Sequence, residues 1–408
     1  MARRILYLSQ WFWPEPATRG LKVAHDLQAR GYEVEVLTGF PNYPSGKLAP
    51  GYRLAPYQRE RIEGVTVHRV FLYPSHDRSS LGRALNYLSF FLSAFVFCLV
   101  QARRFDLIYV YHPPITTGLA AALAGLIWRK PFILEVQDLW PDTVAASGMS
   151  ATGTLARILD PICRFVYKRA ALVLGQSEGM AARLVERGVD PRRAHVFFNW
   201  ADEDAARANG LYDLASLNFE GRFNFVFAGN MGTVQALEVL IDAANSLAKI
   251  APQIQLTLIG EGAERARLET LVRKQGARNV QILPGVPPSH IGDVMAAADV
   301  QVVHLKDDPL FEITIPSKTQ FYLAMGRPIL IGVRGEAARI VTEAGAGIST
   351  PPENSAAMAE AMLHLATLPK TDLQAMGTRA RSAYDSRFAF KATMDRIAAH
   401  VGGVLEKT

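Results

Sequence analysis

The chain has 408 residues, of which 49% are hydrophobic and 20% are charged. This composition is typical of a folded globular protein and excludes a largely disordered one, and the length predicts two domains. The formal net charge of +6 comes from residues 1–205, which hold 24 Lys and Arg against 18 Asp and Glu, because residues 206–408 hold 20 of each. A basic half suits either nucleic acid or an anionic membrane.

The two cysteines, Cys98 and Cys163, lie in apolar helical patterns. They offer neither a disulfide framework nor a metal-ligand spacing, so we expect no metal site at them and a reducing, cytoplasmic setting. The loop after the first strand has no GxGxxG fingerprint, and we expect no cofactor. The first four residues run directly into a strand-like segment, which leaves no room for a signal peptide. We therefore expect a protein that is not exported.

The first half alternates apolar segments with amphipathic ones. Residues 21–30, with Val23 and Leu27 on one face, are typical of a helix. Strands are predicted at 4–9, 33–38, 106–111, 132–136, 171–174 and 195–198. This alternation predicts an α/β domain with a parallel sheet covered on both faces, which binds ligands at the carboxyl ends of its strands.

Residues 85–100 form an uncharged, aromatic-rich segment between Arg83 and Arg103. A membrane-spanning helix needs about 20 apolar residues, so this segment is short for one. Two interpretations stay open. The segment is either a buried core helix or a helix that lies in the membrane interface with its arginines at the headgroups.

The polar stretch 199–218 interrupts the alternation, so we place a domain boundary after residue 205. A second α/β domain is expected at 206–385, and residues 386–408 are expected to form a helix that returns to the first domain. Its strands are predicted at 223–228, 254–259, 280–283, 300–305 and 328–333. Turns at 229–235, 260–262 and 284–285 contain glycines that let a ligand approach the backbone at a helix start.

The stretch 311–328 predicts a loop that leads into a short helix. Pro316 suits the first helical position, and Gly326 suits the end of the helix. Lys318 then falls in the first turn, where the helix dipole disfavours a cation unless an anion shares the site. A phosphate held by Lys318 and by the amides and hydroxyl of Ser317 would remove this conflict. The alternative is an ordinary surface helix that begins at a proline.

Several motifs occur in an order and spacing that resemble the retaining glycosyltransferase family 4. The resemblance covers nearly the whole chain, and within the family it is nearest to the N-acetylfucosamine transferases of the WbuB type, which act in bacterial O-antigen and capsule assembly. The motifs are WPEP after the first strand, VLTGFPNYPSG at 36–46, DLWPD at 138–142, FFNWAD at 197–202, FAGNMGTVQAL at 227–237 and IPSKTQFYLAMGRPIL at 315–330.

The resemblance implies the GT-B architecture, in which two Rossmann-like domains face each other across a cleft. It implies transfer of a sugar from a nucleotide diphosphate sugar, such as a UDP-N-acetyl-deoxyhexosamine, to a polyprenyl-diphosphate-linked saccharide with retention of configuration and without a metal. The expected location is the inner face of the plasma membrane. Nucleic acid is disfavoured because the basic excess accompanies an apolar helix and not an aromatic-basic face.

The resemblance also implies roles for particular residues. The expected catalytic residues are Asp138, Glu312 and Lys318. Those expected to bind the nucleotide sugar are Gly229, Asn230, Gly232, Thr233, Gln235, Gly260, Gly262, Pro284, Ser317, Lys318 and Gln320. The acceptor or phosphate loop is expected to include Thr18, Arg19, Gly20, Gln137 and Asp142. Asp138 has an alternative role, which is to cap the turn before Trp140.

One departure from the family concerns the nucleotide ribose. Many members carry two glutamates in an E-x7-E pattern, the second of which holds the ribose, but the aligned positions here are Ile313 and Phe321. A shift by one residue gives Glu312 and Gln320, so ribose contact is assigned to Gln320. The usual Arg/Lys pair after the first strand of the second domain is also missing, which leaves Lys318 as the expected cation on the diphosphate.

Two other functions are compatible with the same architecture. A UDP-sugar 2-epimerase would need acid and base side chains in the cleft, which this chain supplies poorly. A catalytically inactive nucleotide-sugar-binding protein would bind donors without turnover.

Overall fold

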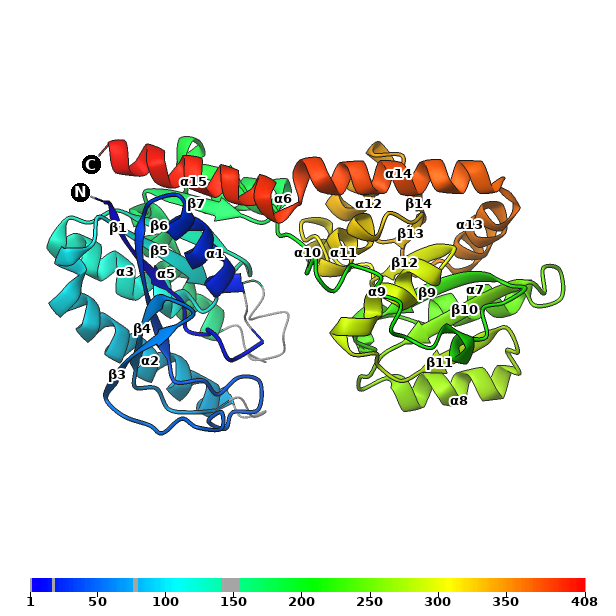
Figure 1. Ribbon diagram of the computed structural model, residues 1–408, viewed down its shortest axis with the longest axis horizontal. Coiled ribbons are helices and arrows are strands. Elements are labelled where there is room, and N and C mark those ends of the chain that lie inside the picture. The colour runs from blue at the N-terminus through cyan, green and yellow to red at the C-terminus, as the bar shows by residue number, and fades with distance from the viewer. Residues whose placement is uncertain (1, 17–18, 76–79, 141, 143–153, 408) are drawn as a thin grey trace. The chain divides into compact units, whose positions relative to one another are not determined.

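The computed structural model describes residues 2–16, 19–75, 80–140, 142 and 154–407 (Figure 1). The chain divides into two compact units, Met1–Phe197 with Met394–Thr408, and Phe198–Thr393. Residues 198–205 therefore belong to the second unit, where the Ala201 amide donates to the Tyr384 hydroxyl at 3.1 Å and that hydroxyl donates to Glu203 at 2.8 Å. The sequence-based boundary after residue 205 lies beyond these bonds.

The end of the chain is divided in the same way. Helix α15 (Phe390–Glu406) begins in the second unit, and its residues from Met394 onward belong to the first. There, Asp395 accepts a hydrogen bond from Arg30 at 2.7 Å. The returning segment thus starts at residue 394 and not at 386.

The first unit is built on one sheet with the strand order β3-β4-β2-β1-β5-β6-β7-β8. Every neighbouring pair is parallel except β3 with β4. Buried apolar residues fill the central strands because helices cover both faces. The strands are β1 (Arg4–Leu8), β2 (Glu33–Gly39), β3 (Tyr57–Ile62), β4 (Val65–Val70), β5 (Leu107–His112), β6 (Phe132–Val136), β7 (Leu172–Gly175) and β8 (Ala194–Val196).

The β3–β4 hairpin is absent from the strands predicted above. Strand β3 has the sequence YQRERI, in which only Ile62 is buried, so it lacks the apolar run on which the prediction relies. Besides the end of α15, the described helices of this unit are α1 (Arg19–Ala29), α2 (Ser80–Gln101), α3 (Ile115–Trp128), α5 (Thr154–Arg169) and α6 (Glu178–Glu186).

Helix α2 combines features of both interpretations of the apolar segment. One face is buried at Asn86, Phe90, Ala94 and Cys98. The opposite face exposes large aliphatic side chains. Within the described residues, Leu81–Arg104 is the one helix long and apolar enough, by length and composition, to cross a membrane. The helix is therefore a core helix on one side only.

The second unit has a fully parallel sheet with the order β11-β10-β9-β12-β13-β14. The chain runs outward from β9 and then returns to pair β12 with β9, so a topological switch point lies between these two strands. The strands are β9 (Phe223–Ala228), β10 (Ile254–Ile259), β11 (Val280–Leu283), β12 (Val300–His304), β13 (Ile329–Gly332) and β14 (Gly347–Ser349).

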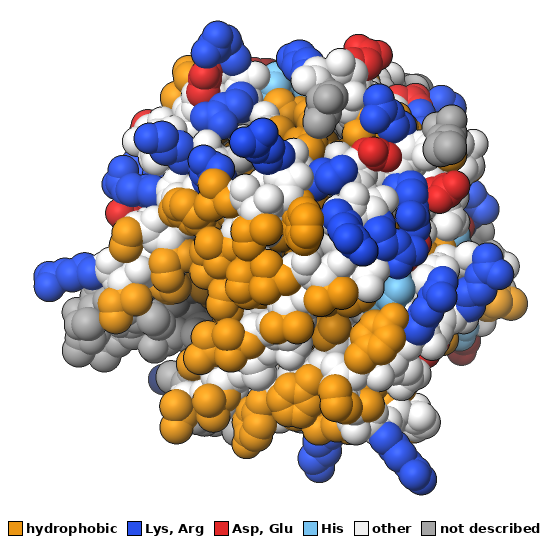
Figure 2. Space-filling view, turned by 90° about the vertical axis from the view of Figure 1, so that its left-hand side faces the viewer, with side chains coloured by type: hydrophobic (Ala, Val, Ile, Leu, Met, Phe, Trp, Pro, Cys, Tyr) orange, Lys and Arg blue, Asp and Glu red, His pale blue; other side chains and the backbone are white. Residues whose placement is uncertain are grey.

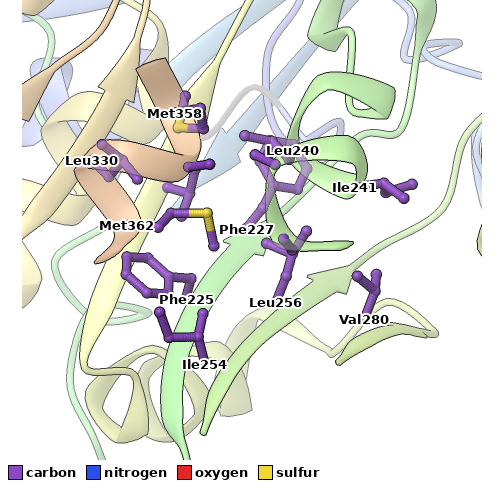
Figure 3. Packing of buried hydrophobic residues seen from close by; sticks show 14 of the residues in the cluster. Phe225, Phe227, Leu240, Ile241, Ile254, Leu256, Val280, Leu330, Met358 and Met362 are labelled. Carbon is purple, nitrogen blue, oxygen red and sulfur yellow. The ribbon is translucent and has the colours of Figure 1, made fainter. Parts of the chain in front are cut away.

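Helices cover both faces of this sheet. They are α7 (Glu238–Leu247), α8 (Arg265–Gln275), α9 (Pro288–Ala297), α10 (Pro309–Glu312), α11 (Ser317–Met325), α12 (Glu336–Glu343), α13 (Ser355–Thr367) and α14 (Lys370–Arg387). The core joins Phe225 and Phe227 of β9 to Leu240 of α7 and to Met358 and Met362 of α13 (Figure 3). This packing fixes the strand end from which the candidate site is built.

Candidate functional site

A cavity of about 410 Å³ lies at the carboxyl end of the second unit's sheet. Open α/β sheets bind ligands at such a place, next to a switch point. The cavity is lined by Trp200, Ala201, Asp202, Ala228, Gly229, Ile259, Gly260, Gly285, Val286, Pro288, Ile291, Ser317, Lys318, Phe321 and Tyr322. Four of the residues assigned to nucleotide-sugar binding are in this set, namely Gly229, Gly260, Ser317 and Lys318.

Two glycine loops form one wall of the cavity. Gly229 follows β9 with a φ of +136°, and Gly260 follows β10 with a φ of +149°. A Cβ atom on Gly260 would lie 1.9 Å from the Gly229 carbonyl oxygen, so the two backbones pack directly against each other. Only glycine fits both the conformation and the contact.

Helix α11 provides the opposite wall. Pro316 is its N-cap and Ser317 its first helical residue, so the predicted start is one position too early. The first bond of the turn is donated by the Thr319 amide to the Pro316 carbonyl oxygen at 2.8 Å. The amides of Ser317 and Lys318 therefore precede the hydrogen-bonded part of the helix, where amides are free to bind an anion.

Tyr322 joins this helix to the end of β9. Its hydroxyl accepts from the Ala228 amide at 3.0 Å and donates to the Ala228 carbonyl oxygen at 3.3 Å. Tyr322 is 1% exposed. This pair of bonds holds α11 against the end of β9, and no local sequence pattern indicates it.

Lys318 is half-buried between the two walls. Its ammonium nitrogen lies 4.6 Å from the centre of the Phe227 ring, and its Cε lies 2.6 Å from the position of a Cβ on Gly229. Burial lowers the pKa of Lys318 from 10.5 to about 8. Among the described residues, no carboxylate forms an ion pair with it. Lys318 is therefore a cation held at a helix start, and the described part of the chain gives it no counter-ion.

The loop after Gly229 is fixed by a buried histidine. His304 donates from Nδ1 to the Gln235 carbonyl oxygen at 2.8 Å and accepts at Nε2 from the Glu353 amide at 3.3 Å. Burial lowers the pKa of His304, so the neutral Nδ1–H tautomer fits both bonds. The Gln235 side chain accepts from the Gly232 amide at 3.0 Å. Gln235 and Gly232 thus shape the loop instead of lining the cavity.

The remaining predicted donor residues lie outside the cavity lining. They are Asn230, Gly232, Thr233, Gln235, Gly262, Pro284 and Gln320, together with the catalytic candidate Glu312. Gln320 is 1% exposed, and its amide nitrogen donates back to the Pro316 carbonyl oxygen at 2.8 Å in the orientation that satisfies both ends of the amide. In this orientation its side chain bonds the start of its own helix, and the ribose contact assigned to it stays a prediction. Glu312 is exposed at the end of α10.

Trp200, Asp202 and Phe321 are among the lining residues that received no role from the sequence. Trp200 packs edge-on against Phe390 with ring centres 4.9 Å apart. Asp202 is exposed at the cavity, and the Phe321 ring also lines it. Trp200 and Asp202 belong to the FFNWAD motif, so the sequence did mark them. Nothing in the neighbouring residues indicated that they lie at the ends of strands that come later in the chain.

In the first unit, Asp138 follows β6 at the carboxyl end of the sheet. It is half-buried, and burial raises its pKa. Within the described residues no hydrogen bond or ion pair to its carboxylate occurs, so the alternative capping role has no bond to support it. A group of aromatic rings surrounds the strand ends here. Trp11 lies 5.6 Å from Tyr43 and 6.4 Å from Tyr87, and Tyr87 lies 6.0 Å from Trp140.

The loop that contains Trp11 is held by a buried carboxylate. Glu15 accepts from the amides of Phe12 at 2.9 Å, Asn42 at 2.7 Å and Tyr43 at 2.8 Å. These bonds join the WPEP and FPNYPSG motifs. Trp11 and Tyr43 therefore owe their positions to Glu15.

Arg19 lies at the start of α1, but its guanidinium faces the interior of the unit. It bonds Glu135 at 2.8 Å, and Gln137 donates to the same carboxylate at 2.7 Å. Gly20 packs against the Phe12 ring, where a Cβ would approach to 2.9 Å. Thr18 lies outside the described residues. Arg19, Gly20 and Gln137 thus stabilise the carboxyl ends of the strands in this unit.

Asp142 is joined to Arg187 by an ion pair of 2.6 Å. Arg187 also pairs with Asp160 at 3.1 Å. The Asp142 carboxylate is therefore engaged with a structural arginine. Among the described residues, no group of three His, Cys, Asp or Glu side chains comes together as metal ligands would.

Comparison with known proteins places these features in a family. Residues 16–200 match the Glycosyl transferase 4-like domain, and residues 222–367 match the Glycosyl transferases group 1 domain. Over 364 residues the chain is 28% identical to the putative colanic acid biosynthesis glycosyl transferase WcaI of Escherichia coli K12, covering 84% of this chain and 86% of that protein. It is 25% identical to the probable glycosyltransferase WbjE of Pseudomonas aeruginosa, covering 95% and 97%.

Solved structures show the same fold. HepE of Anabaena, solved with UDP, superposes with a TM-score of 0.72 at 19% identity and covers 98% of this chain and 100% of its own. Sucrose-phosphate synthase of Thermosynechococcus elongatus superposes with a TM-score of 0.74 at 17% identity and covers all of both chains.

Proposed function

This chain is a glycosyltransferase of the GT-B fold, and we propose that it moves a sugar from a UDP-linked donor to a lipid-linked saccharide with retention of configuration. The observation that carries the proposal is Lys318, a half-buried ammonium at the start of α11 without a carboxylate partner among the described residues. A nucleotide diphosphate supplies the missing negative charge. HepE has been solved with UDP and with UDP-glucose, which supports a UDP-linked donor.

The diphosphate fits the cavity by charge and by shape. The amides of Ser317 and Lys318 and the Lys318 ammonium would bind its oxygens, and the absence of a Cβ on Gly229 lets the Lys318 side chain lie against the loop at the cavity. Negative charge grows on the diphosphate as the glycosidic bond breaks, and these donors are in place before it does. Arranged in this way, the protein supports departure of UDP without a metal.

The nucleoside would then meet an apolar surface. Phe321, Val286 and Ile291 line the cavity, and Phe321 takes the place of the carboxylate that binds ribose in other family members. Asp202 is the lining carboxylate. We assign ribose or sugar hydroxyl contact to Asp202 in place of Gln320.

The acceptor belongs to the first unit in this proposal. Aromatic rings bind the apolar faces of sugars, and Trp11 and Tyr43 lie with Tyr87, whose hydroxyl interacts electrostatically with the Asp138 carboxylate. Burial raises the pKa of Asp138, which brings it nearer to the range of a group that exchanges a proton with an acceptor hydroxyl. A polyprenyl-diphosphate-linked saccharide at the inner membrane face is the acceptor that we propose.

The similarity to WcaI, named for colanic acid biosynthesis, supports a role in making a bacterial surface polysaccharide. Within that role, the WbuB-like motifs favour an N-acetyl-deoxyhexosamine, such as N-acetylfucosamine, as the transferred sugar.

The test combines donor binding with turnover. Thermal shifts are measured with UDP, UDP-sugars, GDP-sugars and dTDP-sugars, because a ligand of the native state raises its melting temperature. The best donor is then incubated with membrane extracts that contain lipid-linked saccharides, and the product's anomeric configuration is read by NMR. A new UDP-sugar formed without acceptor would identify an epimerase instead. Binding without turnover across all donors and acceptors would identify an inactive binding protein.

A further inference from the structure

Helix α2 exposes a row of large aliphatic side chains to solvent. Leu88 is 52% exposed, Leu92 54% and Val96 59%. Steps of three and four residues keep the row on one side of a helix. We call this row the α2 stripe, and its members are Leu81, Leu85, Leu88, Leu92, Val96 and Val100.

The stripe continues onto neighbouring elements. Tyr57 of β3 and Phe71 after β4 are 48% and 40% exposed. Together with Leu92, Val96 and Val100 of the stripe, they line a groove of about 730 Å³. On α3, which packs along α2, Ile127 is 52% exposed. Figure 2 shows the hydrophobic side chains gathered on this face of the molecule. Soluble monomers rarely expose so large an apolar area without a binding purpose.

The charges around the stripe are mostly positive. Between residues 80 and 134 the chain has one acidic residue, Asp106, against Arg83, Arg103, Arg104, Arg129 and Lys130. Arg103, Arg104 and Arg129 are exposed. In Figure 2, Lys and Arg side chains border the hydrophobic area, with few acidic side chains among them. A cationic border around an apolar face is complementary to anionic lipid headgroups.

The buried face of α2 prevents the helix from spanning a bilayer in this fold. Asn86 accepts from Gln10 at 2.5 Å and donates to the Tyr73 carbonyl oxygen at 2.7 Å, so the helix is bonded to the loops of the sheet. On α3, the Trp128 indole donates to the Leu99 carbonyl oxygen at 3.0 Å. The helix can therefore lie along a membrane surface while it stays part of the core.

From these observations we propose that the α2 stripe inserts into the interfacial layer of an anionic lipid bilayer, with the arginines at the headgroups. Tyr87 of the same helix belongs to the aromatic group beside Asp138. A bilayer bound by α2 would therefore lie next to the acceptor site, and a saccharide carried on a membrane lipid could reach it. This last step rests on the proposed function, whereas membrane binding does not.

The test measures partition of the purified protein into vesicles by flotation. Vesicles of phosphatidylcholine alone are compared with vesicles containing about one third phosphatidylglycerol. The stripe variant is Leu88→Gln/Leu92→Gln/Val96→Gln, since glutamine retains helix propensity. The control is Leu211→Gln/Ile250→Gln, because these side chains of the second unit are both 69% exposed. A charge variant, Arg103→Gln/Arg129→Gln, tests the border.

We expect wild type and control to partition at least about tenfold better into anionic than into neutral vesicles, and less at high salt. The partition of the stripe variant into anionic vesicles should fall at least about tenfold. The charge variant should lose mainly the preference for anionic over neutral vesicles. Equal partition of wild type and stripe variant, or no binding by wild type, would overturn the proposal. So would a wild-type dimer, seen by light scattering, that the stripe variant converts to monomer without any vesicle binding. The UDP thermal shift of the stripe variant, expected to equal that of wild type, tests the donor site separately.

Discussion

Replacing Lys318 by methionine should have opposite effects on the free protein and on the protein with UDP. Methionine retains the apolar stem but removes the ammonium. The fall of the Lys318 pKa from 10.5 to about 8 corresponds to roughly 3 kcal/mol of destabilisation at neutral pH. Loss of the contact between the ammonium and the Phe227 ring destabilises the variant by about 1 kcal/mol. Without ligand, the variant should therefore be more stable than wild type by about 2 kcal/mol.

The pH dependence follows from the direction of the shift. Between about pH 8 and 10.5 the unfolded chain binds a proton at Lys318 that the folded chain has released, so wild-type stability rises with pH in this window. Below about pH 8 the full destabilisation is present. The advantage of Lys318→Met should thus be greatest at pH 7 and should shrink toward pH 10.

In the presence of UDP, wild type becomes the more stable of the two proteins. At about 100 times the wild-type Kd, linkage gives wild type about 2.7 kcal/mol of stabilisation. A variant that binds 100-fold more weakly, as loss of a charge-assisted contact predicts, retains about 0.4 kcal/mol.

Urea unfolding and calorimetry of the second unit's transition, at pH 7 and 9.5 with and without UDP, measure all of these changes. Lys249→Met, at an exposed lysine, is the control and should change little. A variant that is no more stable than wild type at pH 7, or that retains the full UDP shift, would refute the assignment of Lys318 to a phosphate site.

Three further changes probe both units. Gly229→Ala should abolish the UDP thermal shift because its Cβ would displace Lys318. The control Gly276→Ala, at a glycine with a positive φ and open space around it, should keep the UDP shift and lower stability by about 1 kcal/mol, and equal UDP shifts in the two variants would contradict the packing. Asp138→Asn should lower kcat at least about 100-fold with unchanged UDP affinity, and a lowered Tm with normal turnover would indicate the capping role instead. Burial lowers the pKa of His112 to about 3. From pH 7 to pH 5 the free energy of unfolding of wild type, measured in urea, should therefore fall by about 2 kcal/mol more than that of His112→Phe, and parallel curves of stability against pH would contradict this.

The sequence determined the features that depend on neighbours along the chain. Alternation of apolar and amphipathic segments predicted two sheets of parallel strands, because covered strands need continuous apolar runs. Proline and glycine at 316 and 326 placed a short helix to within one residue, and the turn that holds Lys318 followed from that. The local pattern did not predict β3, because this polar edge strand has no apolar run.

The tertiary structure alone decided which side chains are available to a ligand. Strand order brings Gly229 to Lys318 and sets Tyr322 on Ala228, and neither contact leaves a trace in local spacing. Arg19 is bound by Glu135, 116 positions away, so its charge is used inside the fold. Whether a polar group bonds the protein or faces a cavity is settled by residues distant in the chain, and periodicity in the sequence records only burial.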